Sequence, residues 1–268
     1  MIIIGEKINS TLKAVRPAIE KYDTKAIQTL ARQQAEAGSA YIDVNAGMFV
    51  GDEPERLTWL VETVQAVVDL PLCLDSPSSL ALEAGLRAYK GESVPMINSI
   101  TDEKERFEAI LPLVQQYKTK VIALCMDDSG MPETGDERFA IAKRLIEKLT
   151  AAGVKLDDIF IDPLVRPVST GAHYGMAALD TIRRVKTEFP EAHIACGLSN
   201  VSFGLPQRKL INQTFLVAAM TVGMDGAILD PLDKKLMSFV AAARAVLGTD
   251  EFCVEYLSKY REGLLADA

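Results

Sequence analysis

The sequence is poor in the residues that build metal centres and disulfide frameworks. Its 268 residues include only two histidines, His173 and His193, and four cysteines, none of them in a Cys-x-x-Cys pair. A zinc site made from Cys and His therefore has little material, and we expect no resident metal. Three thiols, Cys73, Cys125 and Cys196, stand in apolar runs, where cysteine behaves as a small buried hydrophobe. Without a disulfide framework, a reducing compartment is favoured.

Positive charge and long apolar segments are also scarce. The chain carries 37 acidic and 29 basic residues, for a formal net charge of -8. Nucleic-acid-binding proteins concentrate Lys and Arg, so this balance argues against a nucleic-acid partner. The opening MIIIGEKINST has no basic segment before a long apolar run. No apolar run approaches the roughly 18 residues that span a bilayer, and we predict a cytoplasmic protein without a membrane segment.

What the chain does contain is a regular alternation of short apolar runs with longer amphipathic stretches. The runs are short and continuously apolar, as expected for strands of a parallel sheet that are buried on both faces. We predict strands at 2–5, 40–45, 70–76, 94–99, 120–126, 158–163, 193–199 and 225–230.

The stretches between these runs have the period of helices. In the first, Ile27, Leu30 and Ala31 share one face, and Gly38 provides a suitable end. We predict helices at 26–38, 52–69, 78–91, 102–117, 136–153, 175–189, 208–223 and 233–248, with a last helix in the tail 258–268.

Eight strand–helix units of roughly thirty residues match a (β/α)8 TIM barrel, an α/β fold. A doubly wound open sheet is the alternative. No linker rich in Pro, Gly or Ser divides the chain, so we expect a single domain over 1–268.

Nearly every predicted strand ends in an acidic or amide residue. A TIM barrel places catalytic side chains at the carboxyl ends of its strands. Asp, Asn and Ser also serve as turn and helix-capping residues, which is the plainer explanation for any one of them. Their final position after unbroken apolar runs favours one shared mouth. The residues are Glu6, Asn9, Asp43, Asn45, Asp75, Asn98, Asp127, Asp128, Asp162, Ser199, Asn200 and Asp230.

This set of side chains is rich in carboxylates and amides and poor in Lys, Arg and His. A Gly-rich phosphate loop and a G-x-S-x-G motif are both missing, which disfavours phosphorylated substrates and acyl transfer. Carboxylates accept pairs of parallel N–H bonds, and an Asn both donates and accepts. A ligand with a row of N–H donors fits, and the aminopyrimidinone edge of a pterin is such a ligand.

Several motifs at matching intervals carry a family resemblance. They are GEKIN (5–9), DVNAG (43–47), LCLDS (72–76), MINS (96–99), FIDPL (160–164), GLSNVS (197–202) and Arg208 followed by LINQTFLVAAM (210–220). Together they resemble the methyltetrahydrofolate:corrinoid protein methyltransferases, nearly end to end. This family belongs to the pterin-binding barrels, with dihydropteroate synthase and the folate domain of cobalamin-dependent methionine synthase.

The resemblance implies roles for individual residues. Asp75, Asn98 and Asp162 would hold the pterin ring. Asn200 would be the catalytic amide that hydrogen-bonds the ring nitrogen carrying the methyl group, and we also assign Asp162 to catalysis. Helix capping is the alternative role for Asn200. Gly197 and Ser199 would let the backbone approach the ligand.

Other positions would border the site. Glu6, Asn9 and Asn45 are expected to lie behind or beside the ring. Arg208 would meet the folate tail or the corrinoid, or simply be solvated. His173, in a loop after the sixth strand, is either a contact for the partner or an ordinary loop residue.

The implied reaction is methyl transfer, in either direction, between tetrahydrofolate and the cobalt of a corrinoid protein. Cobalamin would arrive on a separate partner, because the Asp-x-His-x-x-Gly signature is missing. Relatives of this kind are homodimers, and apolar positions in 210–223 and 235–248 are compatible with that. The alternatives are a dihydropteroate synthase-like enzyme, whose Lys and Arg on strands seven and eight are not found here, and a non-catalytic folate-binding subunit.

Overall fold

The computed structural model describes residues 1–266 and contains the predicted barrel of parallel strands. Their order around the sheet is β7-β6-β5-β4-β3-β2-β1-β8, so that each strand lies beside its neighbours in the chain. Every paired neighbour runs parallel. The strands are β1 (Ile2–Asn9), β2 (Tyr41–Asn45), β3 (Leu72–Asp75), β4 (Met96–Thr101), β5 (Lys120–Leu124), β6 (Ile159–Asp162), β7 (His193–Ile194) and β8 (Gly226–Leu229).

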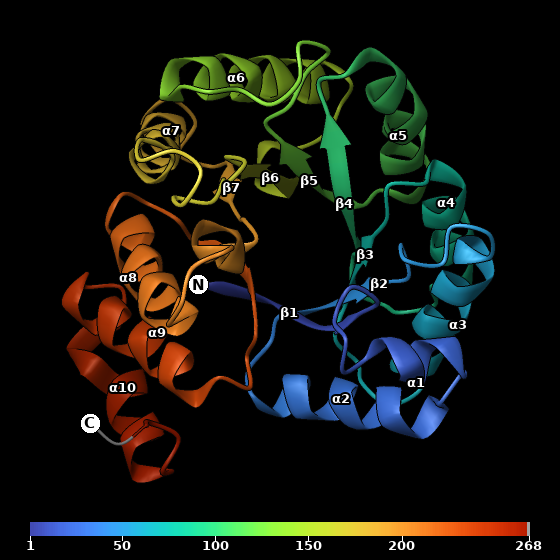
Figure 1. Ribbon diagram of the computed structural model, residues 1–268, viewed down its shortest axis with the longest axis horizontal. Helices are drawn as coiled ribbons and strands as arrows, with labels where there is room; N and C mark the ends of the chain where they lie inside the picture. The colour runs from blue at the N-terminus through green and yellow to red at the C-terminus, as the bar shows by residue number, and fades with distance from the viewer. Residues whose placement is uncertain (267–268) are drawn as a thin grey trace.

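A helix follows each strand and packs outside it, and Figure 1 shows these helices encircling the strands in chain order. They are α2 (Thr24–Glu36), α3 (Glu53–Gln65), α4 (Ser79–Ala88), α5 (Lys104–Tyr117), α6 (Gly135–Ala151), α7 (Tyr174–Glu188), α8 (Arg208–Thr221) and α9 (Lys234–Val246). Over residues 1–266, none of the helices combines the length and apolar character needed to cross a membrane. The eight parallel strands and the helices outside them confirm the predicted fold class, a TIM barrel.

Local sequence signals set several helix ends. Asp23 accepts a hydrogen bond from the Ala26 N–H at the start of α2. Asp233 accepts one from the Leu236 N–H at the start of α9. Thr134 and Glu137 form a reciprocal capping box at the start of α6. These bonds satisfy amide groups that the helix itself leaves unpaired.

Three details differ from the sequence-based expectation. The strand predicted at 193–199 ends at Ile194, because the chain turns into a short 3-10 helix, η2 (Leu198–Ser202). A short helix, α1 (Arg16–Glu20), precedes α2. The last helix, α10 (Val254–Arg261), begins before the predicted tail helix and ends at Arg261; residues 267–268 of that prediction lie outside the described residues.

The barrel closes between β7 and β8, where backbone pairing is sparse. One parallel bridge joins Gly197 to Ile228, and the Ile228 N–H donates to the Cys196 carbonyl over 2.9 Å. The side chain of Asp225, directly before β8, adds to the contacts between these two strands. The Asp225 carboxylate accepts the Ile194 N–H at 2.8 Å and lies 2.9 Å from His193 Nδ1. Asp225 therefore ties β7 to the start of β8.

The floor of the barrel interior is apolar. Each of the eight strand segments contributes one buried hydrophobic side chain to a cluster separate from the layer under the helices. We refer to these residues as the plug: Ile4, Tyr41, Cys73, Met96, Ile122, Phe160, Ala195 and Ile228. Since all are at most 9% exposed, the plug seals the barrel from below.

Asp225→Asn is expected to weaken the seam between β7 and β8. Lys186 Nζ also lies 3.1 Å from Asp225, so the variant loses two charge-assisted contacts. We expect the free energy of unfolding at pH 6 to fall by about 1–3 kcal/mol. The carboxylate raises the pKa of His193. The contribution of the Asp225–His193 pair to stability is therefore complete below the unfolded-state pKa of about 6.5. It is lost as pH rises through the folded-state pKa of His193.

Urea unfolding of wild type and variant from pH 6 to 9 measures this, with the exposed Asp69→Asn as control. The difference between wild type and Asp225→Asn should narrow toward high pH. Equal stability of the two proteins at pH 6 would refute the role of Asp225.

Candidate functional site

The residues two positions beyond the plug form a second layer, at the carboxyl ends of the strands. Successive side chains of a strand point to opposite faces, so residues two apart share a face. This layer therefore lies above the plug, inside the barrel mouth. β5 and the segment after β7 contribute Leu124 and Gly197 to it. The other six strands contribute the polar ring: Glu6, Asp43, Asp75, Asn98, Asp162 and Asp230.

Asn45 holds one member of the ring in place. Its Nδ2 donates to Asp75 Oδ2 over 2.9 Å. Its Oδ1 accepts from Ser10 Oγ at 2.8 Å and from the Gly47 N–H at 3.0 Å. With both ends of its amide engaged, Asn45 orients the Asp75 carboxylate.

Asp43, like Asp230, is a member of the ring that the sequence analysis named at a strand end but gave no role at the site. It is 1% exposed, and its Oδ1 has no hydrogen-bond partner among residues 1–266. Burial, followed by the charge of Asp75, holds the pKa of Asp43 well above its usual range. The available signal was its position two residues before Asn45 on the same strand face.

Burial also raises the pKa values of three other carboxyl groups in the ring, those of Asp162, Asp75 and Glu6. It raises the pKa of Asp162 to about 7 and that of Asp75 to about 6. The pKa of Glu6 rises to about 7 through burial and the nearby charge of Asp230. Asp230 itself is paired with Lys7, at 2.9 Å. The ring is thus partly protonated near neutral pH, and a ligand that presents N–H donors favours its ionised form.

Asp162 links the ring to the segment that carries Asn200. Its Oδ1 accepts the Leu164 N–H at 2.8 Å. The Gly197 N–H also points to this carboxylate and, with the Leu164 N–H, opposes the effect of burial on its pKa. Asp162 therefore fixes the backbone at the start of η2.

Asn200 stands in η2 rather than at a strand end, which corrects the expected placement of both Ser199 and Asn200. The Asn200 side chain is exposed above Gly197. A Cβ atom at position 197 would come within 3.1 Å of Asn200 Nδ2, so glycine leaves room for the amide. The N-cap of α8 is Gln207, so Asn200 does not cap that helix.

Arg208 braces η2 from the first turn of α8. Its Nη2 donates to the Ser199 carbonyl over 2.7 Å, and its Nε donates to Ser202 Oγ over 3.0 Å. The guanidinium thus holds the turn on which Asn200 stands. This contact was not foreseen from the sequence, which assigned Arg208 to a ligand or to solvent.

Four other predicted residues lie outside the polar ring: Asn9, His173, and Asp127 and Asp128, which follow the end of β5 at Leu124. Asn9 Oδ1 accepts hydrogen bonds from the backbone and hydroxyl of Thr11, at 2.9 and 2.7 Å. Its side chain therefore closes the turn after β1. His173 is exposed at the start of α7, where its ring packs against Tyr174.

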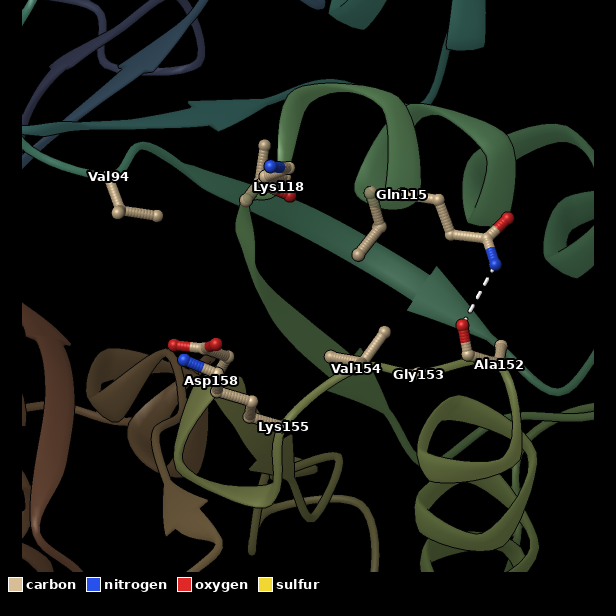
Figure 2. Close-up of a pocket in the computed structure, with 10 residues that line it drawn as sticks. Val94, Gln115, Lys118, Ala152, Gly153, Val154, Lys155 and Asp158 are labelled. Atoms are coloured by element: carbon tan, nitrogen blue, oxygen red, sulfur yellow. Dashed lines mark hydrogen bonds between the residues drawn. The ribbon is translucent and has the colours of Figure 1, made fainter.

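A separate cavity of about 550 Å³ opens at the other end of the barrel (Figure 2). Its walls come from residues that precede β4, β5 and β6, among them Val94, Lys118 and Lys155. Gln115 Nε2 donates to the Ala152 carbonyl at 2.9 Å across one side, as Figure 2 shows. TIM barrel sites form at the carboxyl ends of strands, so the polar ring is the candidate site.

Comparison with known proteins gives a consistent result. The family model described as pterin binding enzyme matches residues 5–230. A methylcorrinoid:tetrahydrofolate methyltransferase of Eubacterium limosum is 38% identical over 98% of this chain and 97% of that protein. Methionine synthase of Mycobacterium tuberculosis is 30% identical over 85% of this chain, which spans only 20% of that protein. A dihydropteroate synthase of Yersinia pestis shares the fold, with a TM-score of 0.72 at 15% identity over 92% of this chain and 94% of that chain.

Asp162→Asn is expected to stabilise the ligand-free protein at alkaline pH. With a folded-state pKa of about 7 against an ordinary value of 3.8, Asp162 binds a proton in the folded state that the unfolded chain has already released. Stability therefore falls as pH rises through this window. The variant removes the buried charge, and we expect a gain of about 1–3 kcal/mol at pH 8 and little change at pH 4.

Thermal and urea unfolding at both pH values measures this gain. The exposed Asp69→Asn should show none. A gain of equal size at pH 4 and pH 8 would contradict a buried, ionising Asp162.

Proposed function

We propose that this chain, which belongs to the family of pterin-binding enzymes, is a methyltransferase between tetrahydrofolate and the cobalt of a corrinoid protein. The end-to-end relative from Eubacterium limosum supports this reaction. The shared segment of methionine synthase supports it independently. The observation that carries the proposal is Asn200, an exposed amide beside a ring of half-buried and buried carboxyl groups.

The polar ring suits a pterin. The aminopyrimidinone edge presents adjacent N–H donors, which an ionised carboxylate accepts in pairs. Asp75 and Asp162 supply the carboxylates, and Asn98 supplies a donor and an acceptor. Asn45 and the Leu164 N–H already fix these carboxylates, so little ordering remains when the ligand binds.

Asn200 supports the chemical step. In the direction from folate, the bond between the methyl carbon and the ring nitrogen breaks while a bond to cobalt forms; the reverse direction exchanges these roles. An amide N–H aimed at that nitrogen stabilises the charge that develops on it. Asp162 and Arg208 fix the two ends of the turn that carries Asn200. We therefore assign catalysis to Asn200, with Asp162 acting on both the ring and this turn.

The dihydropteroate synthase-like alternative has less support. The similarity of this chain to the dihydropteroate synthase of Yersinia pestis, at 15% sequence identity, concerns the fold alone. Where that alternative calls for a Lys and an Arg, the ends of β7 and β8 present Gly197 and Asp230. Lys7 comes from β1 and is paired with Asp230. Turnover of the wild type with Co(I) cobalamin, measured below, distinguishes an enzyme from a non-catalytic folate-binding subunit.

The methyl group must leave through the open mouth, so we propose that the corrinoid arrives on a partner protein docked there. Phe203, three residues after Asn200, is 65% exposed at this rim. We also propose a cytoplasmic setting, since all four cysteines are free thiols. Cell fractionation checks this setting.

We further propose that the chain works as a homodimer. An apolar groove of about 400 Å³ runs between α7 and α8, bordered by the exposed side chains of Met176 and Leu210. Sedimentation of wild type and Leu210→Ser at micromolar concentration checks this, because the substitution should favour the monomer.

Wild type should bind methyltetrahydrofolate in the micromolar range by anaerobic calorimetry, and Asp75→Asn should bind at least tenfold more weakly. Removing one charged acceptor costs roughly 1.5–3 kcal/mol. The exposed Asp69→Asn serves as control. Absence of binding to wild type would reject both pterin reactions.

Asn200→Ala should lower the rate of methyl transfer to Co(I) cobalamin by about 10²–10³, as found for other preorganised donors. The folate affinity should change by less than about fivefold, because this bond strengthens mainly in the transition state. Stopped-flow absorbance of cobalamin measures the rate. An unchanged rate, or no turnover by wild type, would leave Asn200 without a catalytic role.

A further inference from the structure

Arg106, in the first turn of α5, binds the loop that follows β3 and the backbone of the neighbouring strand β4. Its Nη2 donates to the carbonyls of Ser76 and Ser99, at 2.9 and 2.6 Å. Its Nε donates to the Ser99 carbonyl over 3.0 Å, and its Nη1 donates to the Pro77 carbonyl. One half-buried guanidinium thus engages three backbone carbonyls, two in the β3–α4 connection and one within β4.

Two of these carbonyls belong to residues that directly follow members of the polar ring. Ser76 follows Asp75, and Ser99 follows Asn98. The Ser76 N–H also donates to the Asn98 carbonyl over 3.1 Å. On its other side, Ser76 Oγ donates to Glu53 Oε1 at 2.6 Å. The ends of β3 and β4 are therefore fixed to each other and to the helices outside them.

We propose that Arg106 is a positioning residue that sets the spacing of Asp75 and Asn98 for the pterin ring. The proposal rests on the function proposed above, because it takes both residues as pterin ligands. Arginine suits the task, since its planar fork of five N–H donors satisfies several carbonyls at once. A lysine ammonium keeps the charge but lacks this fixed fork.

Arg106 also acts on Asp75 through its charge. Burial is the main cause of the raised pKa of Asp75, and Glu53 on α3 raises it further. Asp43, on β2, is a second carboxyl group near Asp75, and the charge of Asp75 raises the pKa of Asp43. Arg106 and the Asn45 hydrogen bond lower this pKa. The geometry and the charge of Arg106 can therefore be separated by substitution.

The test compares Arg106→Gln, Arg106→Lys and the control Arg87→Gln, an exposed arginine of α4 that bonds Glu83. The first readout is calorimetric affinity for methyltetrahydrofolate at pH 8, where Asp75 is ionised. The second is the pKa of Asp75 in ligand-free protein, from carboxyl-carbon NMR with Asp75→Asn for assignment. The third is the split between KM and kcat for the folate.

We expect both Arg106 variants to lose tenfold or more in affinity at pH 8, with the effect in KM rather than kcat. The Asp75 pKa should rise in Arg106→Gln and stay near its wild-type value in Arg106→Lys. Arg87→Gln should match wild type throughout. Circular dichroism establishes folding, and Arg106→Lys carries the test if Arg106→Gln does not fold.

Tight binding by Arg106→Lys at pH 8, within twofold of wild type, would overturn the proposal, because charge alone would then suffice. An unchanged Asp75 pKa in folded Arg106→Gln would overturn it as well. If wild type itself fails to bind folate, the proposed function fails. The ligand-free titration then still shows whether Arg106 acts on Asp75.

Discussion

The structure depends on one arrangement of side chains: carboxyl groups, one of them fully buried and the others partly buried, stacked directly above an apolar plug. A strand alternates its side chains between two faces, so the step from plug to polar ring is two residues on each of the six strands that contribute to the ring. The plug removes water from beneath the ring and makes ionisation of Asp43, Asp75 and Asp162 unfavourable. The charge of these groups is thus set by the fold before any ligand arrives.

The elements around the ring compensate for this burial in different ways. Asn45 and Arg106 act on Asp75, one by a direct hydrogen bond and the other through backbone carbonyls and charge. Asp162 is supported by backbone N–H groups. Lys7 neutralises Asp230. The supporting groups come from strands, from loops and from a helix outside the barrel, so the site is a property of the whole fold.

The strands and the ring members Asp75, Asn98 and Asp162 were predictable from sequence. Continuous apolar runs that end in an acid or amide mark both a buried strand and the position of its last side chain. The contributions of Asp225 and Arg106 were not, because their partners are distant in the chain. Asp225 bonds an amide 31 residues away, and Arg106 bonds a carbonyl 30 residues away. The early end of β7 also depends on tertiary pairing, since the residues that follow it, Ala195 and Cys196, are as apolar as those of the longer strands.

The sealed floor has a consequence for the order of events. The barrel offers a bound pterin one way in and out, through the mouth that Asn200 borders. A protein that covers this mouth to exchange a methyl group also blocks the folate's exit. With the partner docked as proposed, folate would have to enter before docking and leave after the partner departs, so the sealed floor would impose an order of binding on the two substrates.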